Sequence, residues 1–597
     1  MIQSVSPGFV FLWPFFSPSP IVHRYLKTCF HSNILLPKRV ILPASATPLQ
    51  PYGYLRPCAM AHPNISVPLS VPLTRTVAYH HYAQYSQKIQ DALLRDVLPR
   101  PLSKSEVDAI HHDTLGRIRQ IRELEAFVDA HPEALDAENK LFLARVQFRL
   151  LFCRTFRIND LPVEVLANIF RFVAWSSVSP ATGVYARLSL TWVCRRWREV
   201  AIADSTLWNA IWFREPPPFG RSFEWFRRAE SAPLDIRIND TQDHLFDGPT
   251  MANLLDKILC KMDQIRVFIV IVEGAEAAQT VFEKLRTIGT RIPPTILERL
   301  ELHHSGAKDH DAIHLPSMPL FGGAHMPSLK YVSLNGVHLD WQQSRLANLT
   351  TLDIRRMPFR TSPDLLLFRS IIAGCPNLWK LCLDNAGPQF DIKKSAALDP
   401  ISLPNLKILV YSEFSLGYAL YVASQIHAPN VRDLTLVNFI GEDYTPLFVF
   451  MTTRLPHVRI LTVYSTEVVA SPHMVKWLTS MPEIVYLRIA NIQLNFLTFF
   501  LQRSDPPPAQ QCENNNPLSQ VVCPNLSILD LQRVDPDQAI AWIAHRRKLG
   551  CPIKKVYLSH ELSTKMTEAQ HKRMAELALL FRLEQGVKTP EEDWLLL

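Results

Sequence analysis

Residues 375–383 read CPNLWKLCL, a short stretch in which leucines recur at a fixed spacing. The pattern Leu-x-x-Leu-x-Leu, with other apolar residues at some positions, starts at residues 297, 329, 349, 378, 406, 431, 458, 484 and 526. Most successive copies lie 25 to 29 residues apart. Because side chains alternate between the two faces of a strand, each copy predicts a short strand with its leucines buried on one face.

The segments between the copies have helical spacing, for example PDLLLFRSIIAG and SPHMVKWLTSM. A strand-plus-helix unit of this length buries its leucines only against its neighbours. Stacked units therefore predict an α/β solenoid with a parallel sheet over residues 291–562. The polar, proline-rich residues 504–520 lengthen one interval to 42 residues and predict a loop inserted in one repeat.

Side chains between the buried leucines should point onto the concave surface of such an array. Mixed charges and tyrosines at these positions suit recognition of a protein surface. The alternative is that most of them are simply solvated. The candidate target-binding residues are Tyr331, Asp353, Arg355, Lys380, Asp433, Tyr464, Tyr486 and Arg488.

A second apolar region precedes the array. INDLPVEVLANIFRFV (158–173) and the tryptophan-rich ARLSLTWVCRRWREVAIADSTLWNAIWF (186–213) both have helical spacing. Three short helices in about 55 residues form a core that would be marginal alone. A wide apolar face on so small a module predicts a partner that covers it.

These two segments resemble the F-box, with a connector at 174–188 that is longer than in the compact members. The resemblance implies a three-helix module that docks on a Skp-type adaptor, with the docking face at Leu161, Pro162, Val165, Leu166, Ile169 and Phe170, and with Trp197 and Trp208 bracing the core. The matching positions are Leu161, Pro162, Glu164, Val165, Leu166, Ile169, Phe170, Val193, Cys194, Arg195, Trp197, Leu207 and Trp208.

The array resembles the degenerate leucine-rich repeats that are common behind F-boxes. The long connector, with a helical segment just upstream of the motif, is similar to that of many fungal F-box proteins. The prefix Cys-Pro-x-Leu is similar to that of the cysteine-containing class of these repeats. The usual ladder asparagine after the strand is missing, and Val337 and Ala386 occupy that place in their units.

Together the resemblances imply a substrate-recognition subunit of a cullin-RING ubiquitin ligase of the SCF type, in the ubiquitin conjugation pathway. Such a chain binds the adaptor and a target protein and is not itself an enzyme. The alternative is a non-catalytic leucine-rich-repeat scaffold whose F-box takes no part in ubiquitination. A hydrolase that uses the histidines of HHSGAKDHDAIH (303–314) is a third and weaker hypothesis.

The 597 residues exceed one compact core and predict several domains. We expect a disordered, mis-annotated or targeting leader at 1–90, a helical segment at 103–157, the F-box domain at 158–213, a linker with first irregular repeats at 214–290, and a helical cap or tail at 563–597. Residues 1–90 hold seven Lys and Arg and no acidic residue, so the remainder, with 56 basic and 55 acidic residues, is nearly neutral. This balance disfavours nucleic-acid binding.

The sequence contains no Gly-rich phosphate loop, His-Glu-x-x-His or Gly-x-Ser-x-Gly motif. His310 and His314 could share a helical face, but no third metal ligand follows at a matched distance, so we expect a loop, no metal and no cofactor. Ten cysteines without a Cys-x-x-Cys pair favour reduced thiols in a cytoplasmic or nuclear protein. No apolar run reaches the length of a membrane-spanning helix, so no membrane partner is expected.

Overall fold

The structure is a computed structural model, and the chain divides into two compact units with the boundary between Leu166 and Ala167. The residues that it describes are 103–131, 158–176, 180–241, 244–306, 317–357, 359–391, 398–467, 472–491, 495–504, 520–583 and 588–596, with parts of 136–151. The predicted leader at 1–90, most of the predicted insert, and His310, Asp311 and His314 lie outside these residues. None of the helices in the described ranges combines the length and the apolar character that crossing a bilayer requires.

Helix α3 (Lys104–Ala130) lies within the segment predicted to be helical at 103–157. Ser103 and Glu106 form a reciprocal capping box at its start, which satisfies backbone donors that a helix N-terminus leaves free. The next short elements are a 3-10 turn η1 (Ile158–Asp160) and helix α5 (Val163–Trp175), which crosses the boundary between the two units.

The larger unit contains helices α6 (Pro180–Val193) and α7 (Arg195–Ala203), the turn η2 (Ser205–Leu207), and a sheet of 14 parallel strands in sequence order. The expected fold class, helices followed by an α/β solenoid with a parallel sheet, is confirmed. The strands are β1 (Ala210–Phe213), β2 (Leu234–Asn239), β3 (Ile265–Val272), β4 (Arg299–His304), β5 (Tyr331–Asn335), β6 (Thr351–Arg355), β7 (Lys380–Asp384), β9 (Ile408–Ser412), β11 (Asp433–Val437), β12 (Ile460–Tyr464), β13 (Tyr486–Ala490), β16 (Ile528–Gln532), β17 (Lys555–Ser559) and β18 (Leu579–Leu583).

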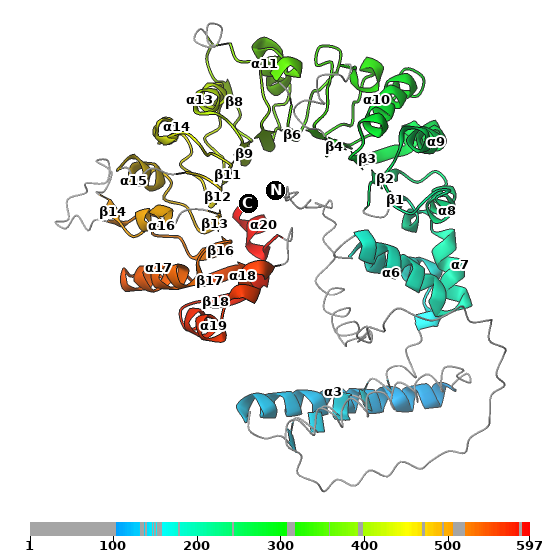
Figure 1. Ribbon diagram of the computed structural model, residues 1–597. Helices are drawn as coiled ribbons and strands as arrows, with labels where there is room; N and C mark the ends of the chain where they lie inside the picture. Colours follow the sequence, from blue (N-terminus) through cyan, green and yellow to red (C-terminus); the bar gives the residue numbers. More distant parts are fainter. Residues whose placement is uncertain are drawn as a thin grey trace, which may run out of the picture. The chain divides into compact units, whose positions relative to one another are not determined.

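Helices connect many of these strands and lie along one face of the sheet (Figure 1). We call the opposite side of the sheet its open face. The helices are α8 (Gly220–Arg228), α9 (Gly248–Ile258), α10 (Ala275–Gly289), α11 (Leu365–Ala373), α13 (Leu416–Ser424), α14 (Thr445–Met451), α15 (Pro472–Thr479), α16 (Asn495–Phe499), α17 (Pro536–Lys548), α18 (His560–Lys565) and α19 (Glu568–Ala575).

The leucine pattern sets which side of each strand is buried. In β13, Leu487 and Ile489 are buried on the helix side, and the strands pair in register, so that they align with Leu461 and Val463 of β12. This continuous apolar layer is the core that the repeat spacing predicts. The sheet begins earlier than the leucine pattern, because β2 and β3 lie within residues 214–290.

A left-handed residue directly after the strand replaces the missing ladder asparagine. Asn385 follows β7 with φ 45°, and Asn438 follows β11 with φ 56°. The backbone N–H of Asn385 donates to the carbonyl of Ser412 at 2.8 Å, and that of Asn438 donates to the carbonyl of Tyr464 at 2.9 Å, so each turn is bonded to the next strand's end. Ala386 is buried beside this turn, so the link to the next unit is made here by the backbone of the preceding residue.

The recurring Pro-Asn prefix forms a second ladder, before the strands. The side-chain amide of Asn405 donates to the carbonyl of Pro376 in the preceding unit at 3.1 Å, and that of Asn430 donates to Pro404 at 2.9 Å. Asn525 makes the same bond to Pro482 at 3.0 Å. The prefix therefore sets the spacing of neighbouring units through side-chain amides at the surface.

The base of the predicted insert is held by a short hairpin. Strands β14 (Arg503–Ser504) and β15 (Gln520–Val521) pair antiparallel, and residues 505–519 between them lie outside the described residues. Fully buried Arg546 of α17 donates to the carbonyls of Phe500, Val522 and Cys523 at 2.8 to 2.9 Å. The two short strands β8 (Ile401–Ser402) and β10 (Ile426–His427) form another small pair, which is parallel.

Candidate functional site

The predicted docking residues, which lie in α5 and just before it, divide into exposed and buried positions. Val165 and Pro162 are exposed, and Leu161 and Ile169 are partly exposed. Leu166 and Phe170 are fully buried, and the ring of Phe170 lies 4.8 Å from that of Trp197. Burial prevents Leu166 and Phe170 from touching a partner directly, so they support the helix from within while the other four remain available for contact.

Large exposed apolar side chains are concentrated in helices α5, α6 and α7. Across the described residues, 17 large hydrophobic side chains are exposed, and seven of them fall in the 40 residues from 163 to 202. Single exposed apolar residues are common on protein surfaces, but this density is not. The seven are Val163, Val165, Phe172, Tyr185, Trp192, Val193 and Ile202.

An ion pair and a tryptophan brace these helices. Arg171 of α5 makes a two-pronged bond to Asp204, at 2.8 and 3.1 Å, and the Asp204 side chain is almost fully buried. The indole N–H of buried Trp208 donates to the carbonyl of Ala201 at 2.8 Å. Trp208 thus packs inside the module, as expected for a bracing residue.

Buried Arg187 of α6 connects the helices to the first repeat, and the sequence pattern did not single it out. Its guanidinium donates to the carbonyl of Ala210, in β1, at 2.7 Å, and lies 4.5 Å from the ring centre of Trp225 in α8. Burial lowers the pKa of Arg187 to about 10, and the nearby charge of Arg221 makes a smaller contribution in the same direction. The arginine stays charged at neutral pH and holds α6, β1 and α8 together.

Four of the candidate target-binding residues form one polar cluster on the open face of β5, β6 and β7. Asp353 is buried, and Arg355 bonds to it at 2.7 and 2.9 Å. Lys380 lies 3.6 Å from the same carboxylate. Burial would raise the pKa of Asp353, but the bonds and charges of Arg355 and Lys380 outweigh it and lower the pKa to about 2.

Tyr331 completes this cluster through Arg299, whose guanidinium lies 4.1 Å from the tyrosine ring centre. Arg299 also pairs with buried Glu301 on the same strand. Most charges of this cluster are paired with each other within the sheet. Its surface is therefore polar with little net charge, and a partner would have to match both its positive and its negative groups.

The other candidates lie further along the sheet, and a helix from the end of the chain covers part of that region. Helix α20 (Pro590–Leu596) lies against the open face. Tyr486 is fully buried, and Arg488 bonds to Asp530 at 2.6 Å and to Glu592 of α20 at 2.8 Å. Asp433 and Tyr464 are partly exposed on β11 and β12. The structure therefore places the eight candidates in two separate regions of the same face.

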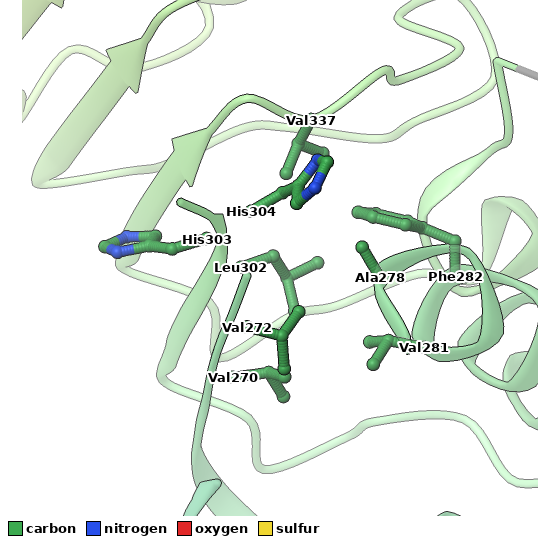
Figure 2. Close-up of a pocket in the computed structure, with 9 residues that line it drawn as sticks. All are labelled: Val270, Val272, Ala278, Val281, Phe282, Leu302, His303, His304 and Val337. Carbon is green, nitrogen blue, oxygen red and sulfur yellow. The ribbon is translucent and has the colours of Figure 1, made fainter. Parts of the chain in front are cut away.

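The two adjacent histidines of HHSGAKDHDAIH lie on opposite faces of β4 (Figure 2). His303 points to the open face and bonds to Ser333 at 3.0 Å, whereas His304 lies beside Val337 on the helix side. Burial lowers the pKa of His303 to about 4, so its ring is neutral at physiological pH. Among the residues that the structure describes, no group of three or more His, Cys, Asp or Glu side chains could hold a metal.

Comparison with known proteins identifies one region. An F-box-like family model matches residues 158–214, which hold η1, α5, α6, α7, η2 and β1. An F-box-like domain is thus present, and the strand-helix solenoid follows it directly, since β1 is both its last element and the first strand of the sheet. A search of curated proteins found no match.

Proposed function

We propose that this protein is the substrate-recognition subunit of an SCF-type cullin-RING ubiquitin ligase. In this proposal the F-box-like domain docks on a Skp-type adaptor, and the open face of the solenoid, built of degenerate leucine-rich repeats, binds a target protein. The observation that carries it is the F-box-like match at residues 158–214, together with the exposed apolar residues of α5 in that range.

The physical character of the domain supports an adaptor interface. Pro162, just before α5, and Val163 and Val165 in its first turn are exposed, and Phe170 further along the helix packs on Trp197. An apolar surface on a small, braced module is the kind of surface that another protein covers, because desolvating it on binding is favourable.

The link between the two parts supports a positioning role. Arg187 and Trp208 join the F-box-like helices to α8, since Trp208 lies 5.4 Å from Trp225 and under the guanidinium of Arg228 at 4.8 Å. A fixed geometry keeps a bound target at a defined distance from an attached conjugating enzyme. Effective concentration, rather than covalent chemistry by this chain, then accelerates ubiquitin transfer.

The test uses paired substitutions of equally exposed valines. Val165 on α5 is 43% exposed and Val449 on α14 is 46% exposed. We expect Val165→Asp to abolish co-purification of the adaptor and the cullin from cells, and Val449→Asp to leave both unchanged. The double variant Leu161→Ala with Pro162→Ala should also lose both, with an unchanged melting temperature.

Two outcomes would contradict the proposal. Recovery of the adaptor without any cullin would favour the alternative function, a repeat scaffold that takes no part in ubiquitination. Undiminished adaptor binding by the folded Val165→Asp variant would place the interface elsewhere.

A further inference from the structure

The open face of β9 to β17 has an occupant that belongs to the same chain. Helix α20 places two neighbouring carboxylates, Glu591 and Glu592, on the sheet, and both are almost fully buried. Glu591 accepts from Lys555 and, at 2.6 Å, from the hydroxyl of Tyr557. Glu592 accepts from Arg488 at 2.8 Å. Buried carboxylates that are each paired with a cation are specific contacts, since an unpaired one would be costly.

The apolar end of the same helix fills an apolar part of the face. Leu595 and Leu596 are buried in a cluster with side chains from five strands. Two arginines bond to the backbone beside them: Arg459 donates to the carbonyl of Leu595 at 3.3 Å and Arg432 to that of Leu596 at 2.8 Å. The sheet residues of the cluster are Ile408, Ile460, Tyr486, Ile528 and Tyr557.

The sheet side and the helix side are complementary in charge. The sheet contributes Arg432, Arg459, Arg488 and Lys555, while residues 591–593 of the helix read Glu-Glu-Asp. Trp594 lies between the acidic residues and the leucines. Its side chain is 54% exposed, so it contributes little to the contact with the sheet. We call the surface formed by these four cations and the apolar cluster the cradle.

Helix α20 cannot owe its order to its own sequence. It has seven residues, fewer than the 12 to 15 or so that an isolated helix needs to be even marginally stable in water. Its buried side chains lie in the cradle, although Thr589 also donates its backbone N–H to Glu592 at 2.8 Å within the segment. Four residues, 584–587, separate the segment from β18. The cradle therefore selects and orders a short peptide segment.

We propose that the cradle is a binding site for a short helical segment of a target protein that carries two adjacent carboxylates followed, three residues later, by two large apolar side chains, and that residues 588–596 of this chain occupy it until such a segment displaces them. This deepens the proposed function, because it names the chemistry that the open face recognises. It also makes the unoccupied cradle the active form.

Residues 584–587 join the occupying segment to β18, and this covalent link determines how tightly a target segment must bind in order to displace it. A link of four residues holds its own segment close to the cradle, and short links of this kind give effective concentrations in the millimolar range. A target segment must therefore bind the cradle tightly enough to compete at that level, or the tethered segment must first be displaced. Removing the tethered segment should raise the affinity for an added peptide of the same chemistry.

The experiment uses the full chain with a specific protease site in place of residues 584–587. The probe is a labelled synthetic peptide with the sequence of residues 588–597, KTPEEDWLLL, and its binding is followed by fluorescence anisotropy before and after cleavage. We expect cleavage and removal of the released segment to strengthen binding at least tenfold. A peptide with Glu591→Gln and Glu592→Gln, or the cleaved Lys555→Gln protein, should lose most of that binding.

Lys554→Gln is the matched control, since Lys554 is the exposed neighbour of Lys555, whereas the ammonium group of Lys555 pairs with Glu591 of α20. It should bind the peptide as the cleaved wild-type chain does. Equal peptide binding before and after cleavage would overturn the proposal, because the cradle would then not be the peptide's site.

A cleaved chain that loses its sheet, seen as a collapsed thermal transition, would also overturn the proposal, because α20 would then be a permanent part of the fold. The variant Leu595→Ser with Leu596→Ser in the uncleaved chain is a second check: it should bind the peptide while remaining folded. Adaptor binding plays no part in these measurements, so a failure here and a failure of the proposed function are separate results.

Discussion

The guanidinium of Arg187 lies 4.5 Å from the ring centre of Trp225, and the same guanidinium donates to the carbonyl of Ala210. This contact joins a helix of the F-box-like domain to the first strand and the first helix of the sheet. Helix α6 of the domain and the first strand and helix of the solenoid are therefore packed together around one buried charge.

Replacing Arg187 should therefore destabilise the unit that contains both parts. Arg187→Met leaves the carbonyls of Leu207 and Ala210 without this donor, and we expect a loss of about 2–3 kcal/mol in the free energy of unfolding. Urea denaturation followed by circular dichroism measures it. Arg195→Met, at a side chain that is 91% exposed, should change stability by less than about 0.5 kcal/mol.

Phe170 should matter to folding rather than to adaptor contact. Phe170→Ala removes a fully buried ring from the core beside Trp197 and should cost about 3–5 kcal/mol. Val163→Ala, at an exposed position on the same helix, should leave the melting temperature almost unchanged. A Phe170→Ala protein with wild-type stability would show that this core does not support α5.

The buried imidazole of His303 should make stability depend on pH. Its pKa is lowered by burial to about 4, while an unfolded histidine titrates near 6.5, so the stabilisation is fully present above about pH 6.5 and is lost as the pH falls towards 4. The charged groups around it are Asp353, Arg355, Arg237 and Arg356.

Thermal melts at pH values from 7 to 4 should show a steeper loss of stability for the wild type than for His303→Gln. One such group contributes at most about 1.4 kcal/mol per pH unit. His545→Gln, at an exposed histidine of α17, should keep the wild-type pH dependence. Identical pH profiles for wild type and His303→Gln would contradict a neutral buried ring.

The left-handed turn at Asn438 should tolerate glycine and reject a β-branched residue. Asn438 has φ 56°, a conformation that asparagine and glycine adopt readily and valine does not. Asn438→Val should lower the free energy of unfolding by about 1–2 kcal/mol, and Asn438→Gly should stay within about 0.5 kcal/mol of the wild type. Urea denaturation of the two variants checks this: the midpoint should fall for Asn438→Val and stay near that of the wild type for Asn438→Gly, with the same dependence of the free energy on urea concentration in both.

The insert should be removable, because its base is held independently of it. Replacing residues 505–519 with Asn-Gly closes the hairpin of β14 and β15 with a two-residue turn. We expect stability within about 1 kcal/mol of the wild type, since loop length has a weak effect on closure entropy. Arg546→Met, in contrast, should be strongly destabilising, because it leaves the carbonyls of Phe500, Val522 and Cys523 without their donor.

Local patterns in the sequence were enough to predict the repeats and their buried face. The alternation in IVYLRI predicts that Leu487 and Ile489 point away from Arg488, and the structure has this arrangement because strand geometry is a property of neighbouring residues. The leucine pattern does not extend to β2 and β3, which lie in residues 214–290, where a linker and first irregular repeats were expected. Their segments LDIRIN and IRVFIVIV carry strand patterns, but they do not share the leucine spacing of the later units.

The sequence by itself determined the F-box-like motif, the strand-helix alternation and which side of each strand is buried, since all of these depend on spacing along the chain. Only the tertiary structure decided which motif residues remain exposed, with Val165 at the surface and Phe170 in the core. It also decided that Glu592 meets Arg488, 104 residues away, so that part of the predicted target surface is already covered. Contacts between distant segments depend on how the units stack, and stacking leaves no local pattern that reveals a partner so far along the chain.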